Sequence, residues 1–407
     1  MEGFEGCPVV PLDFIDDELR RLAEAGLERR LVAVTTRQGR TVEVAGRTLL
    51  SFCSNDYLGL AGDPRLAKAA AEALERYGLG SAASRLVSGN MTLHETLEAR
   101  LAEFKGTEAA ILFCTGYAAN LGTIPALVGR GDLVVSDRLN HASIIDGCRL
   151  SGATLRVYAH CEVEGLERIL KRGSRFRRRL VVTDTVFSMD GDVAPLAEIV
   201  EVAARHDAMV MVDEAHATGV LGETGRGAAE ALGVSDRIDI QMGTLSKGLG
   251  ALGGYVAGSA RLIEFLRQRA RSFIYSTAPP VAVCAAVLAA LDVVEADPGR
   301  RRRCLDLARH LRNLLSESRP GLLAPVGGPL TPIIPVVVGD PQRACRIAEA
   351  LFERGFLVRA IRPPTVPAGT SRLRISVTAA HTREDVQALA GALDEVLSLC
   401  LPEGGPG

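Results

Sequence analysis

Met209-Val210-Met211-Val212-Asp213-Glu214-Ala215-His216 is the stretch that decides the fold. Residues 209–213 form a short apolar run that ends in an acid, and a histidine follows at 216, the pattern of a buried strand followed by a polar loop. Similar runs lie at residues 109–114, 132–136, 154–158, 180–185, 239–245 and 254–258, and helical patterns such as 93–104, 117–127, 163–171 and 196–205 lie between them. Seven runs alternating with helices predict a mostly parallel sheet with helices on both faces.

Lys247 follows another of these apolar runs, in Gly243-Thr244-Leu245-Ser246-Lys247-Gly248. Only four of the 47 basic residues are lysines. Arginine cannot replace a lysine whose amine must form an imine, because the guanidinium stays protonated. A lysine nucleophile with a strand-end carboxylate upstream, here Asp213, is typical of pyridoxal phosphate (PLP) chemistry.

Polar residues follow several of the other runs, at the strand ends where ligands collect in parallel sheets. A buried Asp213 could keep the pyridine nitrogen of PLP protonated. His216 and Ser188 could reach the phenolic oxygen of the cofactor, and His141 could stack on its ring. Taken singly, each also suits an ordinary structural role, such as a strand-end acid, a turn serine or a helix cap.

A phosphate group needs backbone amides at the start of a helix. Residues 113–120 supply a strand, a turn at Gly116 and a helix start, and Thr244 is a second candidate ligand. The carboxylate of an amino-acid substrate is best held by arginine. Arg372 and Arg374 share one face of a predicted strand, so either could reach the site.

The remaining features exclude several classes of protein. The net charge of −2 gives no support for nucleic-acid binding. Asp213-Glu214-Ala215-His216 spells the DEAH string of helicases, but the phosphate loop of a nucleic-acid-dependent ATPase is missing. Gly248-Leu249-Gly250-Ala251-Leu252-Gly253 precedes a strand instead of a helix, so these glycines are expected to pass close to the cofactor, not to bind a dinucleotide.

The expected location is the cytoplasm, with no membrane contact. The apolar stretch 281–291 is about half the length that spans a bilayer, and residues 1–5 lack the start of a signal peptide. The nine cysteines are scattered, with no Cys-x-x-Cys pair, so neither disulfides nor a metal site is predicted.

We predict three segments along the chain. Residues 1–52 hold an N-terminal helix at 14–31 and two short strands, and residues 53–290 form the large PLP-binding α/β domain. Residues 291–407 form a smaller α+β domain.

From about Leu19 to Leu397 the chain resembles the α-oxoamine synthases, fold-type I PLP enzymes that join an amino acid to an acyl thioester with loss of carbon dioxide. The resemblance includes Ser54-Asn55-Asp56-Tyr57-Leu58-Gly59-Leu60 and Ser84-Arg85-Leu86-Val87-Ser88-Gly89 followed by His94. Residues 361–370, Ile-Arg-Pro-Pro-Thr-Val-Pro-Ala-Gly-Thr, are typical of the members that serve biotin biosynthesis.

The resemblance implies an aspartate-aminotransferase-like fold, a homodimer with shared active sites, and specific roles for individual residues. Lys247 would carry the Schiff base and act as the base, with Asp213 on the pyridinium, His141 on the ring, and Ser188 and His216 at its oxygen. The further contacts implied with the cofactor are Gly116, Tyr117 and Thr244, and those implied with the substrates are Asn55, Arg374, Arg29 and Thr365. Arg30, adjacent to Arg29, is the alternative for the acyl contact.

The implied reaction joins L-alanine to a pimeloyl thioester. The alternative is a sibling that uses glycine or serine, such as glycine C-acetyltransferase. The acyl carrier is coenzyme A or acyl carrier protein, and the basic run at 171–179 is a candidate patch for the acidic protein.

Overall fold

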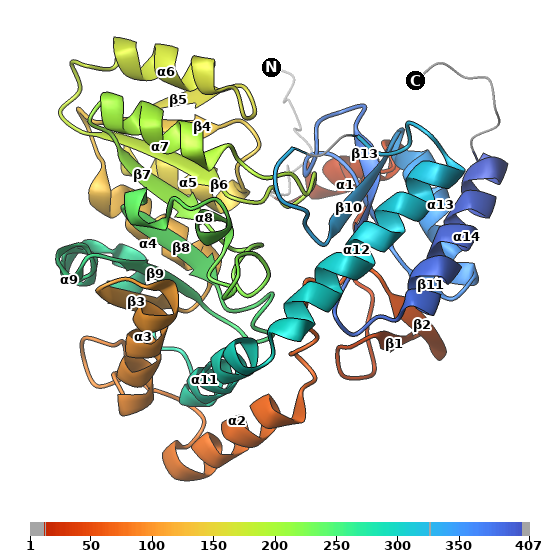
Figure 1. Cartoon of the computed structure of the whole chain (residues 1–407), viewed down its shortest axis with the longest axis horizontal. Helices are drawn as coiled ribbons and strands as arrows, with labels where there is room; N and C mark the ends of the chain where they lie inside the picture. Colours follow the sequence, from red (N-terminus) through yellow and green to blue (C-terminus); the bar gives the residue numbers. More distant parts are fainter. Residues whose placement is uncertain (1–11, 13, 325–326, 401–407) are drawn as a thin grey trace, which may run out of the picture.

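The computed structural model describes residue 12 and residues 14–324 and 327–400. The predicted absence of a signal peptide concerns residues outside this range. Figure 1 shows a large lobe built on a seven-stranded sheet and a smaller lobe that contains β10, β13 and α12–α14. No helix in the described part of the chain is both long enough and apolar enough to cross a membrane.

The large sheet has the strand order β3-β9-β8-β7-β6-β4-β5. Five neighbouring strands run parallel, and β9 pairs antiparallel with both β3 and β8, which confirms a mostly parallel sheet. The strands are β3 (Ala109–Phe113), β4 (Leu133–Asp137), β5 (Thr154–Tyr158), β6 (Arg179–Asp184), β7 (Met209–Asp213), β8 (Ile240–Thr244) and β9 (Gly254–Gly258). Successive side chains of one strand point to opposite faces of the sheet, so they enter different cores. Val181 packs on one face and Val182 on the other.

Helices cover both faces of this sheet. Residues of α6 and α7 share one core with the sheet, and residues of α4 and α5 share the core on the other face. The helices of the large lobe are α2 (Pro64–Tyr77), α3 (Thr92–Lys105), α4 (Gly116–Leu127), α5 (Ala142–Ser151), α6 (Val163–Arg172), α7 (Leu196–Arg205), α8 (Ala228–Ala231), α9 (Ala260–Arg269), α10 (Arg271–Ile274) and α11 (Val281–Ala296).

The small lobe contains two three-stranded sheets, β10-β13-β12 and β1-β2-β11. Its strands are β1 (Thr41–Val44), β2 (Arg47–Ser51), β10 (Ile333–Gly339), β11 (Phe356–Leu357), β12 (Arg359–Ile361) and β13 (Ser371–Ser376), and its helices are α12 (Pro298–Ser318), α13 (Pro341–Glu353) and α14 (Arg383–Cys400). Because β2 pairs in parallel with β11, the N-terminal strands share a sheet with the C-terminal part. The division of the sequence at residues 52 and 290 separates these partners.

The structure differs from the sequence prediction in the extent of the N-terminal helix. The N-terminal helix α1 (Phe14–Glu24) ends before residue 31, because Gly26 takes the left-handed backbone conformation at φ +65°. Two of the glycines of 248–253, Gly248 and Gly250, pass close to the backbone of other segments. A Cβ on Gly248 would lie 2.4 Å from the carbonyl oxygen of Thr218, and one on Gly250 would lie 2.5 Å from the amide of Ala61.

The basic run 171–179 lies away from the predicted PLP residues. It spans the end of α6 and the start of β6, so it lies at the amino edge of the parallel strands. The predicted PLP residues follow the carboxyl ends. Within the run, Arg177 pairs with the buried Asp132 at 3.0 Å, and Arg178 donates to the carbonyl of Leu127. A carrier bound there would face the edge of the sheet opposite those residues.

Candidate functional site

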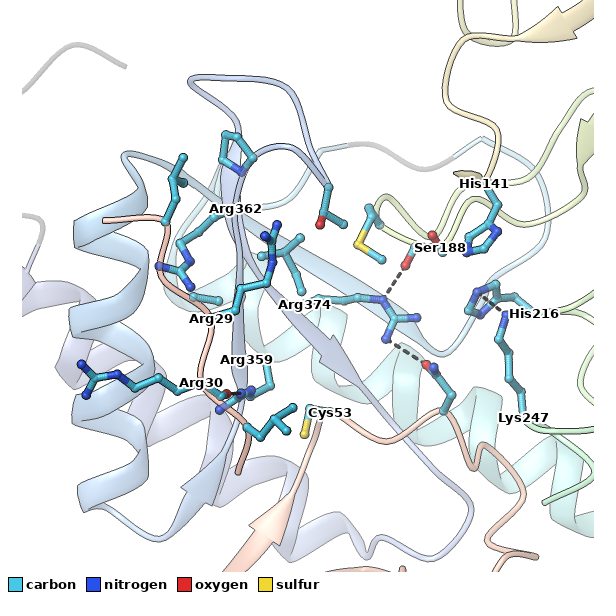
Figure 2. A pocket seen from close by; sticks show the side chains of 18 residues that line it. Arg29, Arg30, Cys53, His141, Ser188, His216, Lys247, Arg359, Arg362 and Arg374 are labelled. Atoms are coloured by element: carbon cyan, nitrogen blue, oxygen red, sulfur yellow. Dashed lines mark hydrogen bonds between the residues drawn. The ribbon is translucent and has the colours of Figure 1, made fainter. Parts of the chain in front are cut away.

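A cavity of about 550 Å³ lies between the carboxyl edge of the large sheet and the small lobe. Figure 2 shows the side chains that line it. Eight of the predicted site residues line this cavity, namely Arg29, Asn55, His141, Ser188, His216, Lys247, Thr365 and Arg374. Parallel sheets bind ligands at this edge because the loops that follow the strands meet there.

Lys247 contributes the amine at the base of the cavity. It follows β8, and its Nζ lies 2.9 Å from Nε2 of His216, which follows β7. The other ring nitrogen of His216, Nδ1, lies 2.6 Å from the hydroxyl of Tyr57. Burial, together with the positive charges of Lys247 and Arg374, holds the pKa of His216 well below its ordinary value. The neutral ring can therefore accept a hydrogen bond from the lysine amine at Nε2.

The electrostatics of Lys247 predict a dependence of stability on pH. Burial lowers the pKa of Lys247 from 10.5 to about 8, although Asp213 and Asp184 oppose the shift. Between these two pH values the unfolded chain binds more protons than the folded chain, so the free energy of unfolding rises with pH. We expect Lys247→Met to stabilise the PLP-free protein by roughly 2–3 kcal/mol at pH 7. Urea unfolding should show this difference shrinking towards pH 10.5; a difference that does not change with pH would contradict the explanation.

Asp213 lies behind the cavity, at the end of β7, and only 3% of it is exposed. Its Oδ2 accepts a hydrogen bond from Asn120 of α4 at 2.9 Å, and Oδ1 accepts from the amide of Ala215. Asn120 also donates to the hydroxyl of Ser143, which is 2.7 Å from Nδ1 of His141. One hydrogen-bonded chain thus fixes both the predicted partner of the pyridinium and the predicted stacking ring.

His141 combines the two placements that the sequence left open as alternatives, a helix cap and a side chain at the site. It is the N-cap of α5, with Nδ1 accepting from the amide of Ser143, and its ring also lines the cavity. Its backbone amide donates to the carboxylate of Asp184 at 2.6 Å. Burial raises the pKa of Asp184 well above its usual value, and the nearby charge of Asp213 adds to the effect.

Of the residues predicted for the phosphate end, Gly116 and Tyr117 begin α4 and Thr244 ends β8, and none of the three lines the cavity. Thr115 caps the helix by accepting from the amide of Ala118, and the first amides of any helix lack partners within the helix. A Cβ on Gly116 would lie 3.2 Å from Met242 and 3.3 Å from Thr244, so the backbone passes close to β8. The hydroxyl of Tyr117 bonds Asp146 instead, and that of Thr244 bonds the carbonyl of Gly253.

Of the two arginines on β13, Arg374 lines the cavity. Its Nη1 donates to Oδ1 of Asn55 at 3.0 Å, and its Nε donates to the carbonyl of Ser188, as Figure 2 shows. Arg372 instead binds the carboxylate of Asp190. The two-residue period of the strand allowed either arginine to point into the site, and of the two it is Arg374 that lines the cavity.

The mouth of the cavity is basic. Arg29 and Arg30 both line it, so the structure does not distinguish them, and Arg359 and Arg362 face them from the small lobe. Arg362 donates to the carbonyls of Gly26 and Glu28, the second at 2.8 Å. These bonds hold the segment that carries Arg29 beside the mouth.

Besides Arg359 and Arg362 at the mouth, sequence reasoning missed three residues that hold the predicted site residues in place, namely Asp184, Tyr57 and Asn120. Asp184 ends a strand, just as Asp213 does, so the same strand-end signal was available for it. Tyr57 lies inside the segment quoted for the family resemblance. Asn120 follows a helix start, and nothing local indicates that its side chain reaches Asp213 from another element.

Comparisons with known proteins identify the family. The family model described as "Aminotransferase class I and II" matches residues 47–393. A protein from Anaeromyxobacter dehalogenans, named 8-amino-7-oxononanoate synthase, is 56% identical over 97% of this chain and 98% of the relative. The chain belongs to the 8-amino-7-oxononanoate synthase family. A relative of the same name from Geobacter sulfurreducens is 53% identical over 94% of this chain and 97% of its own length.

Solved structures confirm the fold of this synthase family. A serine palmitoyltransferase variant from S. paucimobilis, solved with PLP and myriocin bound, matches with a TM-score of 0.90 at 34% identity. The match covers 97% of this chain and 99% of that chain. The 8-amino-7-oxononanoate synthase of Francisella tularensis has a TM-score of 0.74 at 29% identity, over 86% of this chain and 98% of its own. The predicted fold-type I architecture is confirmed, and so is the resemblance to the α-oxoamine synthases.

PLP is the cofactor of this synthase family, and the site fits it. A lysine amine with lowered pKa faces the cavity, and a buried carboxylate, Asp213, stands 34 residues earlier in the chain at the end of β7. The helix start at Gly116 offers amides and a close backbone approach suited to a phosphate.

Proposed function

We propose that this chain catalyses the decarboxylative condensation of L-alanine with a pimeloyl thioester, releasing CO2 and the free carrier. The product is 8-amino-7-oxononanoate, an intermediate of biotin biosynthesis. The observation that carries this proposal is the 56% identity, over 97% of this chain, to a relative that is named for this activity. The arrangement of Lys247, His216 and Arg374 around one cavity supports the same reaction.

Bound PLP supplies an aldehyde carbon for an amine and a cationic ring that withdraws electrons from the substrate. We assign Asp213 to its pyridine nitrogen, His141 to its ring face, Ser188 and His216 to its phenolic oxygen, and Gly116, Tyr117 and Thr244 to the phosphate end. The side-chain hydroxyls of Tyr117 and Thr244 have protein partners, so the phosphate would rely mainly on backbone amides there.

Lys247 is assigned two tasks, covalent attachment of the cofactor and movement of a proton at Cα of alanine. A general base works best when its pKa lies near the working pH. Burial brings the pKa of Lys247 to about 8, which suits this task. Nε2 of His216, 2.9 Å away, is positioned to orient the amine.

Arg374 and Asn55 are assigned to the carboxylate of alanine. Arg374 is 6% exposed, and its guanidinium is fixed by Asn55, Ser188 and Ser376. A guanidinium held in a fixed orientation binds a carboxylate with defined geometry. This would place Cα of the substrate near Nζ of Lys247.

The acyl donor is assigned to the basic mouth. Thr365 and the adjacent arginines Arg29 and Arg30 line it, together with Arg359 and Arg362. These cations suit an anionic donor, whether its charge lies on the pimeloyl carboxylate or on the carrier. A carrier protein would therefore dock at this mouth and not at the run 171–179.

The substrate assignment is tested by measuring thiol release from pimeloyl and acetyl thioesters with alanine, glycine or serine. We expect alanine with a pimeloyl donor to give the highest kcat/KM. Arg374→Gln should raise the KM for the amino acid by roughly 10- to 100-fold, because one charge-assisted bidentate contact contributes about 1.5–3 kcal/mol. A preference for glycine with the acetyl donor would instead identify a glycine C-acetyltransferase.

We further propose that the enzyme is a cytoplasmic homodimer. Large apolar side chains near the start of α4 are exposed, including Leu86 (55%), Val87 (79%), Tyr117 (44%) and Tyr275 (71%). They belong to connected segments, because Ser84 pairs with Thr277 and Cys114 donates to the carbonyl of Thr277.

The state of the cysteines supports the proposed compartment. Unpaired cysteines in the described chain suit a reducing compartment such as the cytoplasm.

The dimer prediction is checked by light scattering. Wild type should have twice the mass of the chain, and Val87→Asp should shift it towards the monomer and reduce activity. The matched control is Leu399→Asp. Leu399 is a similarly exposed apolar side chain (74%) on α14 of the small lobe, so this variant should stay dimeric. A monomeric, fully active wild type would contradict the proposal.

A further inference from the structure

A second polar cluster lies next to the site, around His160. Its Nδ1 is 3.0 Å from Asp137 and its Nε2 is 2.7 Å from Asp192. The ring also meets Phe187 edge-on, with centroids 4.3 Å apart at 90°. Asp137 belongs to the end of β4, whereas Asp192 and Phe187 belong to the loop that follows β6. The imidazole therefore joins the large sheet to that loop.

The loop is a tight hairpin over residues 185–194. Val186 pairs with Val193, the amide of Phe187 donates to the carbonyl of Asp192, and the amide of Ala194 donates to that of Thr185. Ser188 stands at its tip and lines the cavity. The position of this side chain thus depends on what holds the hairpin.

Two arginines hold the hairpin from the small lobe. Arg374 donates to the carbonyl of Ser188, and Arg372 donates to the carbonyl of Met189 at 3.3 Å and to the carboxylate of Asp190. His160 is the counterpart on the side of the large sheet. Within the described residues it is the one cation within ion-pair distance of Asp192.

The charge state of His160 follows from its partners. Burial alone would lower its pKa, but hydrogen bonds to Asp137 and Asp192 outweigh this effect and raise the pKa to about 12. As an imidazolium it donates from both nitrogens. Asp137 is 1% exposed and also accepts the amides of Leu139 and Cys161, so the sheet side of the contact is rigid.

A metal site is the competing explanation for this cluster. Asp137, His160 and Cys161 are close enough together to share an ion. Both ring nitrogens, however, already lie within hydrogen-bond distance of carboxylate oxygens. Both oxygens of Asp137 also accept hydrogen bonds from backbone amides. No lone pair of the imidazole is left for a metal.

We propose that His160 is a positioning residue whose ion pair with Asp192 fixes the hairpin 185–194, and through it the orientation of Ser188 and Arg374. This inference rests on the proposed function only in taking alanine as the ligand of Arg374. A displacement of about 1 Å in a positioned group can change turnover or binding by roughly 100-fold. The contact therefore matters to the substrate although His160 does not line the cavity.

The test compares His160→Gln, Asp192→Asn and Asp192→Ala with wild type. We expect the KM for alanine to rise by roughly 10- to 100-fold in Asp192→Ala and His160→Gln. Asp192→Asn, which keeps an acceptor, should be affected less. The KM for the pimeloyl thioester and the covalent attachment of PLP should change little. The matched control is His206→Gln, a histidine whose side chain is 21% exposed, close to the 26% of His160, and which lies 3.8 Å from Glu167.

A second readout does not depend on activity. In histidine-labelled protein, NMR should show that the His160 ring stays protonated at pH 9, and added Zn²⁺ should leave its signals unchanged. Titration of the ring near pH 6.5, a shift with Zn²⁺, or an unchanged KM for alanine in both Asp192→Ala and His160→Gln would overturn the proposal. Failure of wild type to use alanine would overturn the proposed substrate instead, and the NMR result would still decide the state of His160.

Discussion

Lys247→Ala is expected to abolish the covalent attachment of PLP and to lower kcat by at least roughly 10²–10⁴-fold. The factor is the usual contribution of a positioned general base. The effect is large because one amine has two tasks, attachment of the cofactor and proton movement at Cα of alanine. Borohydride reduction followed by mass spectrometry of the intact protein measures attachment, and thiol release measures kcat.

Lys68→Ala is the matched control for this substitution. Lys68 lies on α2 with 79% of its side chain exposed, 3.8 Å from Glu72, and exposed pairs of this kind contribute little to stability. It should keep both the covalent link and the activity. A borohydride-fixed adduct of normal yield in Lys247→Ala would show that another residue carries the cofactor.

The sheet could be predicted from the sequence because its signal is local. Each strand is a short apolar run bounded by polar residues, and three predicted ranges, those at 154–158, 209–213 and 254–258, coincide with β5, β7 and β9. The order of the strands could not be predicted, since it depends on crossovers between distant segments. The same holds for the pairing of β2 with β11, which joins residues about 300 positions apart.

The candidate site divides in the same way. Asp213 ends an apolar run, and Lys247 and His216 follow such runs, so their place at the carboxyl edge was predictable. Their chemistry narrowed the choice of cofactor to PLP. The partners that fix them were not predictable. Tyr57 reaches His216 across 159 residues, and Asn120 reaches Asp213 across 93. Such contacts depend on tertiary structure and leave no periodic pattern in the sequence.

Asp213→Asn is expected to lower kcat by roughly 10²–10⁴-fold while the protein stays folded and keeps PLP covalently attached. Loss of one partner from a buried ion pair costs about 3–5 kcal/mol, and each 1.4 kcal/mol is a factor of ten. The substitution is nearly isosteric. Asparagine can still accept the hydrogen bond from Asn120, but its neutral amide no longer favours a protonated pyridine nitrogen. The loss should therefore fall on kcat more than on the KM for alanine.

Asp132→Asn separates this electrostatic role from the general effect of removing a buried carboxylate. Asp132 is also fully buried, but it pairs with Arg177 at the opposite edge of the sheet. We expect Asp132→Asn to lower the thermal midpoint and leave kcat within about twofold of wild type, since it touches no residue of the site. Steady-state kinetics and thermal unfolding of both variants make the comparison. Equal losses of kcat in the two variants would mean that Asp213 acts through the stability of the sheet and not on the cofactor.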